Sequence, residues 1–274
     1  MRCEPSLPEG GDEQAAGAAN ESTSPESDSR APSASIIVPV FNERDTIARV
    51  IGQVHDAAMA AGIDVEIVVV DDGSADGTAD IVRALGPGFG VRLIQHATIH
   101  GKGAAVKTGI AAACGRVAAI QDADLEYDPR DSMLAIAMVL GGSAPAVYGS
   151  RLRIARGRGQ MARMNYFANR ALTRFGNWAL RTHLTDLETG CKVWTRSLFS
   201  ADAVTADRWG IDPELTGLIV AHGAVITEID VSYTPRDAAA GKKMRWDGFF
   251  HVVAALIACR RRGLRTPRST AVRR

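Results

Sequence analysis

The chain has 274 residues, of which 46% are apolar, and this size and composition suit one large α/β domain or slightly more. Its formal net charge of +1 lacks the basic excess typical of nucleic-acid-binding proteins, so no nucleic-acid partner is expected. The four cysteines include no C-x-x-C pair, and no stretch approaches the roughly 18–20 apolar residues of a membrane span, which argues against structural zinc, a disulfide scaffold and a transmembrane helix.

The two ends of the chain differ in charge. Residues 1–34 carry seven acids and two arginines, whereas residues 259–274 carry seven arginines and no acid. Because residues 1–33 are rich in Glu, Ser, Pro, Gly and Ala without apolar periodicity, we predict a disordered acidic tail there, and a basic tail over 263–274. The polar start does not resemble a signal peptide, and scattered cysteines favour a reducing compartment, so a cytoplasmic protein is expected.

Strands and helices alternate through the first half of the remaining sequence. Apolar runs predict strands at 35–40, 65–70, 91–95 and 117–121. Helices are predicted at 45–61, after a capping residue within the turn 71–78, and from Gly101-Lys102-Gly103 to about 113. This alternation predicts an α/β fold with a doubly wound, mostly parallel sheet flanked by helices.

The second half is less regular. We predict a helix over 129–140, a strand over 145–149, a basic loop over 150–159 and a helix over 161–181. Residues 185–194 are polar and then apolar. A further helix is predicted from Ile211, with Asp212 as its N-cap and Pro213 in its first position. The remaining predicted elements are a strand over 225–233, a loop over 236–245 and a helix over 246–262.

Four carboxylates alternate directly after the fourth predicted strand, at Asp122, Asp124, Glu126 and Asp128. Acids this close repel one another. A hard cation such as Mg²⁺ or Mn²⁺ relieves that repulsion, because it takes one or two carboxylates together with the phosphate oxygens of a substrate. The Asp-x-Asp pair is therefore expected to hold a divalent cation and a diphosphate.

Two other interpretations of the same stretch stay open. A calcium loop of the EF-hand kind requires Gly at its sixth position and Glu at its twelfth, where this sequence has Tyr127 and Met133. Alternatively, the acids form a solvated turn that caps the next helix, with Asp128 as N-cap and Pro129 at the first helical position.

Three polar clusters, Asn42-Glu43, Asp71-Asp72 and Asp122-Asp124, each follow a predicted strand. Ligands bind at the carboxyl ends of the strands in such sheets, so the clusters are expected to converge in space. Asp71 or Asp72 either hydrogen-bonds a base or ribose or caps the next helix. Lys102 fits neither the Walker nor the dinucleotide pattern, and it either binds an anion near a helix N-terminus or stands in a turn that the glycines shape.

Further candidates for chemistry lie in the second half. Asp186 and Glu188 are either acceptor-side groups, including a general base, or ordinary surface acids. Two or three basic residues are expected to neutralise a diphosphate or an acceptor phosphate, the rest being solvated, among Arg151, Arg153, Arg156, Arg158, Arg236, Lys242 and Lys243.

Taken together, these segments resemble glycosyltransferase family 2, and within it the polyprenyl-phosphate sugar synthases of the dolichol-phosphate mannosyltransferase type. The resemblance covers about residues 35–250 and rests on SIIVPVFNERDTI, EIVVVDDGSADGT, GKGAAVKTG, QDADLEYDP, YGSR, TDLETGCKVW, IDPELTGLI and PRDAAAGKKMRWDG. It implies a GT-A nucleotide-diphospho-sugar transferase fold and inversion at the anomeric carbon. The implied single domain is 34–262, with a nucleotide-binding half at 34–128 and an acceptor half at 129–262.

The resemblance also implies roles for individual residues. The nucleotide-sugar donor, of GDP-mannose or UDP-glucose type, would contact Pro39, Phe41, Glu43, Asp71 or Asp72, Lys102 and Asp122. Asp122 and Asp124 would hold the metal, and Arg151, Arg236, Lys242 and Lys243 would face the donor diphosphate or an acceptor phosphate. Three departures concern the sugar and the nucleotide: Phe41 replaces the usual Tyr, Glu126 replaces Gln and adds a metal ligand, and Gly-Lys-Lys replaces Ser-Lys.

Three functions are compatible with this pattern. The favoured one is sugar transfer to a polyprenyl phosphate, which is already an anion and needs only basic residues to bind it. The second is transfer to a hydroxyl group, for which a carboxylate such as Asp186 must take the proton. The third is a non-catalytic nucleotide-sugar binding module. The helix over 246–262 and the arginines after it either rest on an anionic membrane at its cytoplasmic face or pack on the sheet.

Overall fold

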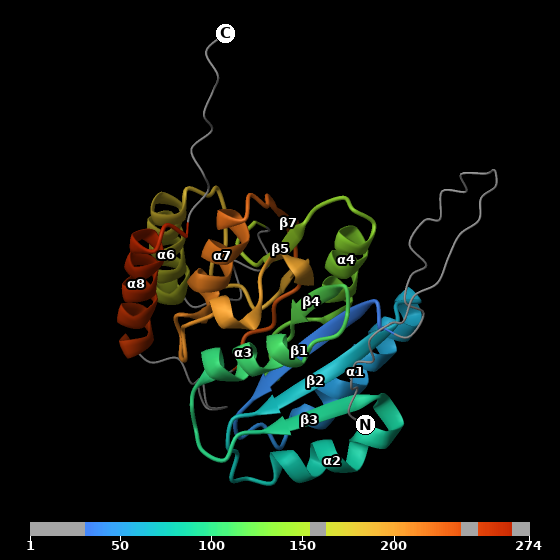
Figure 1. Cartoon of the computed structure of the whole chain (residues 1–274). Coiled ribbons are helices and arrows are strands. Elements are labelled where there is room, and N and C mark those ends of the chain that lie inside the picture. The colour runs from blue at the N-terminus through green and yellow to red at the C-terminus, as the bar shows by residue number, and fades with distance from the viewer. Residues whose placement is uncertain (1–30, 154–162, 237–245, 265–274) are drawn as a thin grey trace, which may run out of the picture. The chain divides into compact units, whose positions relative to one another are not determined.

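Seven strands form one sheet in the computed structural model, which describes residues 31–153, 163–236 and 246–264 (Figure 1). In the order in which they lie, the strands are β3 (Val91–Gln95), β2 (Val65–Asp71), β1 (Ala34–Val40), β4 (Val117–Ile120), β6 (Lys192–Thr195), β5 (Ala146–Ser150) and β7 (Ile226–Asp230). β6 is antiparallel to β4 and β5, and the other neighbouring pairs are parallel. The predicted mostly parallel sheet is therefore confirmed. The antiparallel strand β6 was not predicted, because its four residues are too few to show a strand pattern in the sequence.

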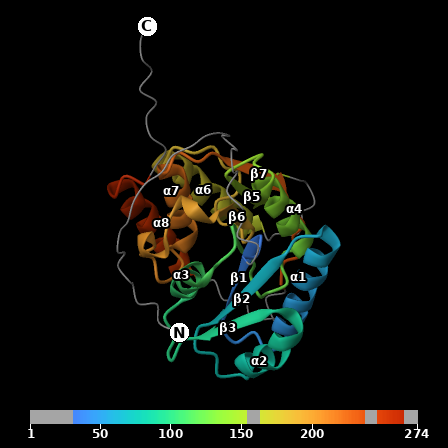
Figure 2. The ribbon, with the colours of Figure 1, turned by 45° about the vertical axis from the view of Figure 1, so that its right-hand side comes forward.

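Helices cover both faces of this sheet (Figures 1 and 2). One face carries α1 (Ile47–Ala61), α2 (Thr78–Phe89) and α4 (Pro129–Leu140). The other carries α3 (Lys102–Ala112), α6 (Arg163–Leu180), α7 (Ile211–Ala221) and α8 (Trp246–Arg261). Two single 3₁₀ turns, η1 (Arg196–Leu198) and η2 (Ala201–Ala203), follow β6.

The central strands are buried on both faces, which explains their unbroken apolar runs. Ile36 and Val38 of β1 belong to the core beneath α1 and α4, whereas Ile37 belongs to the core beneath α3. Successive side chains of a strand point to opposite faces, so a strand covered twice needs apolar residues at every position.

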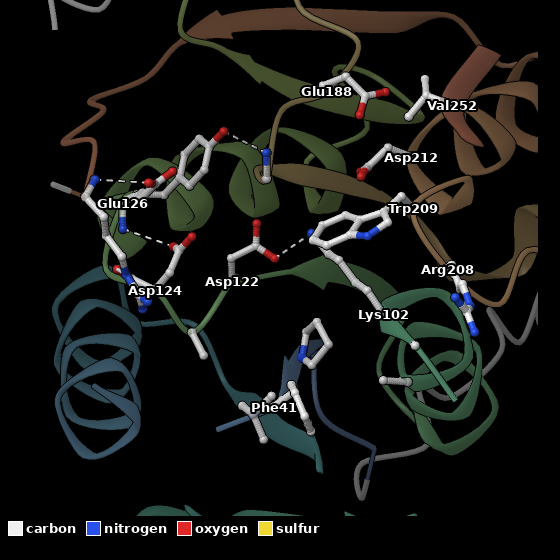
Figure 3. A pocket seen from close by; sticks show the side chains of 18 of the residues that line it. Phe41, Lys102, Asp122, Asp124, Glu126, Glu188, Arg208, Trp209, Asp212 and Val252 are labelled. Carbon is white, nitrogen blue, oxygen red and sulfur yellow. Dashed lines mark hydrogen bonds and ion pairs between the residues drawn. The ribbon is translucent and has the colours of Figure 1, made fainter. Parts of the chain in front are cut away.

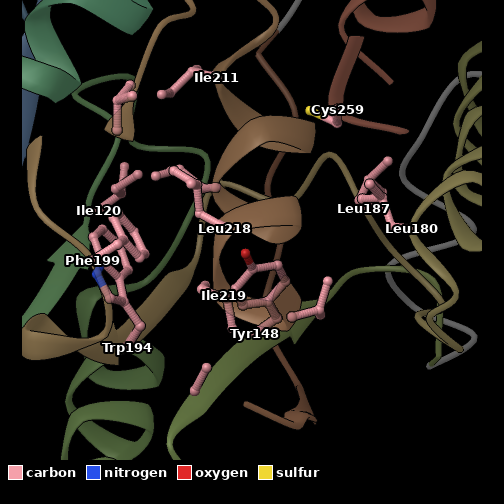
Figure 4. Close-up of a cluster of buried hydrophobic side chains, with 14 of the residues drawn as sticks. Ile120, Tyr148, Leu180, Leu187, Trp194, Phe199, Ile211, Leu218, Ile219 and Cys259 are labelled. Carbon is pink, nitrogen blue, oxygen red and sulfur yellow. The ribbon is translucent and has the colours of Figure 1, made fainter. Parts of the chain in front are cut away.

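The core on the α3 side extends to the antiparallel part of the sheet (Figure 4). Trp194 of β6 stacks on Phe199, with 5.7 Å between the ring centroids. α7 is buried on almost every side because it lies between the sheet and α8, so Ile211, Leu218 and Ile219 all join this core.

The helix termini test the predicted capping residues. Asp128 caps α4, since its side chain accepts a hydrogen bond from the Arg130 backbone N at 2.9 Å with Pro129 at the first position. α7, however, begins at Ile211 with Gly210 as its N-cap, so the prediction of Asp212 as the cap is wrong. Asp212 instead pairs with a buried lysine of β6, because a buried ammonium group requires a counter-charge.

Several predictions concern residues outside the described ranges. These are the acidic tail apart from residues 31–33, most of the basic loop over 150–159, the loop residues Lys242 and Lys243, and the basic tail beyond Leu264. The predicted strand over 225–233 is shorter in the structure, and Tyr233 forms an isolated bridge with Tyr127. None of the described helices combines the length and the apolar character that crossing a bilayer requires.

Candidate active site

A pocket of about 660 Å³ lies at the carboxyl ends of the central parallel strands (Figure 3). The residue pairs that follow β1, β2 and β4 in the sequence all contribute to its wall, through Phe41, Glu43, Asp72, Asp122 and Asp124. The structure thus brings together the three polar clusters, because β1 lies between β2 and β4 and the three strands run in the same direction.

Lys102 forms an ion pair with Asp122 inside this pocket. Its Nζ lies 2.8 Å from Asp122 Oδ1, and both side chains are largely buried. Burial by itself lowers the pKa of Lys102, but the neighbouring carboxylates of Asp122 and Asp212 reverse this and raise it above its ordinary value. Gly103 is required beside Lys102 because a Cβ atom there would collide with the Ala206 carbonyl oxygen. The glycines therefore let α3 bring a permanent cation into the pocket.

Asp124 is held at the same end of β4 by its own turn. Its Oδ1 accepts a hydrogen bond from the Glu126 backbone N at 3.1 Å. Burial, followed by the charges of Asp122 and Glu126, raises the pKa of Asp124 to about 7. A carboxylate whose ionisation is opposed in this way gains from a nearby cation, which would compete with the proton.

The carboxylate of Glu126 is hydrogen-bonded to residues that follow β7 in the sequence. It accepts hydrogen bonds from Tyr233 Oη at 2.9 Å and from the Arg236 backbone N at 3.0 Å. Arg236 in turn pairs with Glu43 at 2.6 Å and donates to the Asp124 carbonyl oxygen at 2.8 Å. This geometry favours Glu126 as a support for the Arg236 segment over its predicted use as a metal ligand.

The pocket suits a metal ion that a substrate helps to bind. Among the described residues, no group of three or more His, Cys, Asp or Glu is arranged to hold a metal by itself. Asp122 and Asp124 nevertheless both line the pocket, and Mg²⁺ commonly binds through one or two carboxylates plus substrate phosphates. The donor set of this site therefore fits such an ion.

Arg151 reaches the pocket from the end of β5, held by Asp186. Its Nε and one terminal nitrogen each lie 2.7 Å from a different oxygen of Asp186, and its backbone N donates to the same carboxylate. The charge of Asp186 outweighs the effect of burial and raises the pKa of Arg151. Asp186 is fully buried behind Arg151 and does not line the pocket. The geometry therefore favours a positioning role for Asp186 over the predicted general base.

Glu188 is the carboxylate of this segment that lines the pocket. Its Oε1 is buried and has no hydrogen-bond partner in the part of the chain that the structure describes. Burial, and then the charge of Asp212, raises the pKa of Glu188 to about 8. A buried carboxyl oxygen with no protein partner is available to a substrate group.

Two further pocket residues were missed by the sequence interpretation. Asp212 lines the pocket and lies 2.7 Å from Lys192 Nζ, whose side chain is almost fully buried. Trp209, just before α7, also lines it. The sequence feature that could have identified Asp212 is Lys192, because a lysine buried within an apolar strand requires a carboxylate partner.

The structure distinguishes among the residues that were predicted to contact the nucleoside. Pro39, Phe41, Glu43 and Asp72 line the pocket, whereas Asp71 is fully buried beneath it and accepts a hydrogen bond from the Ser74 backbone N at 3.0 Å. Asp72 accepts from the backbone N atoms of His100 and Gly101, at 3.0 and 2.7 Å. Neither residue caps α2, whose N-cap is Gly77; Asp76, just before it, accepts a hydrogen bond from the Thr78 backbone N at 3.0 Å.

Comparison with known proteins decides the family. The family model described as Glycosyl transferase family 2 matches residues 35–205. The chain belongs to glycosyl transferase family 2. This confirms the resemblance seen in the sequence and the prediction of a glycosyltransferase enzyme, and the match of the layered sheet to solved glycosyltransferase structures confirms the GT-A fold.

The chain is similar to curated family members over part of their length. Glycosyltransferase AglJ from Haloferax volcanii is 28% identical over 202 residues, which is 73% of this chain and 63% of AglJ. A dolichol-phosphate mannosyltransferase from Pyrococcus furiosus is 34% identical over 117 residues, 43% of this chain and 32% of that enzyme. The matched region thus spans from about a third to less than two thirds of these relatives.

Solved structures share the fold at low sequence identity. The glucosyl-3-phosphoglycerate synthase of Mycobacterium tuberculosis, in complex with Mn²⁺, uridine diphosphate and phosphoglyceric acid, superposes with a TM-score of 0.60 at 20% identity. The superposition covers 87% of this chain and 80% of that one.

Proposed function

We propose that this domain transfers a hexose from a nucleotide-diphospho-sugar to a polyprenyl phosphate, with inversion at the anomeric carbon. The observation that carries the proposal is the mixed lining of the pocket. The Asp122–Lys102 pair and Asp124 line it together with Arg151 and with the apolar side chains of Ala168, Leu172 and Val252. The acids and Lys102 suit a sugar diphosphate with its metal ion, and Arg151 with the apolar side chains suits a phosphate on a hydrocarbon chain.

The donor is proposed to bind where β1 and β2 end. Phe41 supplies an apolar surface for the base, and Glu43 and Asp72 supply acceptors for its polar edge or for the ribose. Lys102 and Asp122 then lie beside the diphosphate. Because Phe41 replaces the usual Tyr, the pocket residues do not select one base, and the proposal includes both GDP- and UDP-sugars.

Asp122 and Asp124 are proposed to hold Mg²⁺ or Mn²⁺ together with the donor. A divalent ion bound there supplies positive charge to the leaving diphosphate. Among the chain's own groups, Lys102 adds charge at the same point, and Arg151 orients the acceptor phosphate through its fixed guanidinium. An acceptor phosphate oxygen forms the bond to the anomeric carbon, and the bond to the donor diphosphate breaks, with its electron pair leaving on the diphosphate oxygen.

The decisive experiment is a transfer assay with a panel of UDP- and GDP-sugars, with and without polyprenyl phosphate. We expect sugar transfer to the lipid phosphate with one class of donor in the presence of Mn²⁺ or Mg²⁺. Transfer only to soluble hydroxyl acceptors, at undiminished rates, would contradict the proposed acceptor. We place the reaction at the cytoplasmic face of a membrane, as the charge pattern and cysteine usage favour.

One observation favours the second candidate, transfer to a hydroxyl group. Glu188 presents an unpartnered carboxyl oxygen to the pocket, with a pKa raised toward neutrality, as a general base requires. Two variants separate the candidates. If Glu188 takes a proton, Glu188→Gln lowers kcat by roughly 10²–10⁴-fold. If the acceptor is a phosphate, the same variant changes mainly KM.

Asp186→Asn serves as the matched comparison for that test. Its carboxylate supports Arg151 and does not line the pocket, so the variant should lower the melting temperature and weaken acceptor binding. A pH–rate profile that lost its acidic limb in Asp186→Asn but not in Glu188→Gln would restore Asp186 as the base.

A further inference from the structure

Large apolar side chains are exposed on one pair of helices. Nine such side chains are exposed among the described residues, and five of them belong to α6 and α8. We name these five the α6/α8 face: Met164, Phe167, Trp178, Phe250 and Ile257. Phe167 is 67% exposed and Trp178 is 59% exposed, values far above those of an aromatic side chain in a core. An apolar concentration of this kind on two adjacent helices indicates an interaction surface.

The face is what remains after both helices have packed on the domain. Leu172 and Leu180 of α6, and Val252 and Leu256 of α8, are buried in the core shared with α7. α6 and α8 lie side by side on the same edge of the molecule (Figures 1 and 2). Packing therefore fixes which sides of the helices point outward, and these sides carry aromatic residues.

The two helices carry mostly basic charge. α6 contains no Asp or Glu, and α8 contains none after Asp247. The exposed side of α6 carries Arg170 and Arg174 between its apolar positions. Arg260 lies 4.1 Å from the centroid of the Trp178 ring and donates to the Trp178 carbonyl oxygen at 3.2 Å. Aromatic side chains interleaved with arginines, without acids, fit a surface that is apolar within and negatively charged outside.

The same helices connect the face to the pocket. Met164 belongs both to the face and to the pocket wall, to which α6 also contributes Leu172 and α8 contributes Val252. The face and the pocket therefore meet at Met164.

We propose that the α6/α8 face docks on an anionic lipid bilayer, with Phe167, Trp178 and Ile257 in the interface and the arginines against the head groups. This deepens the proposed function and rests on it for the identity of the acceptor. A second copy of the chain fits the face less well, because a two-fold interface would bring arginines against arginines. From the sequence alone, membrane contact was predicted through the last helix and the arginines after it. In the structure, three of the five side chains of the α6/α8 face belong to α6.

The test is co-sedimentation with vesicles of phosphatidylcholine alone or with about a third phosphatidylglycerol, at low and moderate salt. We expect binding to anionic vesicles that weakens with salt, and a loss of at least tenfold in partitioning for the double variant Phe167→Glu, Ile257→Glu. The matched control is Leu134→Glu, since Leu134 is 54% exposed on α4, across the sheet. Circular dichroism confirms that each variant is folded.

Three outcomes overturn the proposal: equal binding to neutral vesicles, no binding at either salt, or unchanged binding by the double variant. A dimer of the parent chain that the double variant dissolves would assign the face to self-association instead.

A transfer assay separates the face from the proposed function. With a short-chain, water-soluble prenyl phosphate, the double variant should match the parent chain, because neither Phe167 nor Ile257 lines the pocket. With a long-chain acceptor embedded in anionic vesicles, it should lose activity in proportion to binding. Vesicle binding without transfer to any prenyl phosphate would leave the face in place and remove the proposed acceptor.

Discussion

At the scale of single residues, the pocket is organised by paired charges. Asp122 pairs with Lys102, and Glu43 pairs with Arg236, while the Asp186 carboxylate is held behind the wall by Arg151. Each pair satisfies a desolvated charge, and each leaves a cation near the space that a diphosphate or phosphate would fill. The side chains are thus held in position before a substrate binds.

Asp124→Asn tests the proposed metal dependence. We expect at least a ~100-fold fall in rate, because a bound divalent ion stabilises developing charge by several kcal/mol. The melting temperature should not fall, since the carboxylate is destabilised by its neighbours and its pKa is raised to about 7. Titration with EDTA, followed by restoration with Mn²⁺ or Mg²⁺, is the parallel measurement, and full activity in excess EDTA would refute the metal.

Glu188 gives a pH dependence whose sign follows from its burial. Its pKa rises from 4.5 to about 8 in the folded chain, so the folded state keeps a proton that the unfolded state releases above about 4.5. The free energy of unfolding therefore falls as pH rises through this window. We expect Glu188→Gln, which cannot ionise, to melt higher than the parent chain at pH 8 and with little difference at pH 4–5. The same difference at both pH values would contradict the shifted pKa.

At the scale of elements, α8 shows how a helix serves two surfaces. Leu256 is fully buried against the core, whereas the next residue, Ile257, is 39% exposed on the α6/α8 face. Of the two alternatives raised for this helix, the structure shows packing, which is on α6 and α7 rather than directly on the sheet. Contact of its outer side with a membrane stays a proposal.

Leu256→Ala measures the packing contribution of α8. Removing a fully buried leucine side chain should lower the free energy of unfolding by about 2–5 kcal/mol, because lost burial and a residual cavity add. Ile257→Ala is the neighbouring control and should cost much less. Equal losses in denaturant titrations of the two variants would show that α8 is not anchored as described.

At the scale of the whole molecule, the pocket lies where the chain order in the sheet reverses. β1 has β2 on one side and β4 on the other, and the crossing connections leave on opposite faces, so a crevice opens at their carboxyl ends. Residues far apart in the sequence meet there, and β6 and α7 then bring Lys192 and Asp212 to the same place.

Binding of a nucleoside diphosphate should consequently protect distant segments together. We expect the backbone amides of 39–43, 71–73, 99–103 and 122–126 to exchange more slowly when UDP or GDP is added with Mn²⁺. At 100 times its Kd, such a ligand should also stabilise the fold by about 2.7 kcal/mol. Protection of only one of these segments, or of α6 and α8 in their place, would move the nucleotide site elsewhere.

The sequence by itself determined the fold class, the positions of most strands and helices, the family and the set of strand-end acids. These features are local: β-branched runs, helical periodicity and a capping Asp128 depend on neighbouring residues. The tertiary structure decided which acids face the pocket. Asp72 lines the pocket and Asp71 does not, because adjacent residues at a strand end point in opposite directions. Likewise, Glu188 lines the pocket, whereas Asp186 binds Arg151. The role of Asp212 was likewise decided by the tertiary structure, since its partner Lys192 is 20 residues away and only packing brings the two charges together.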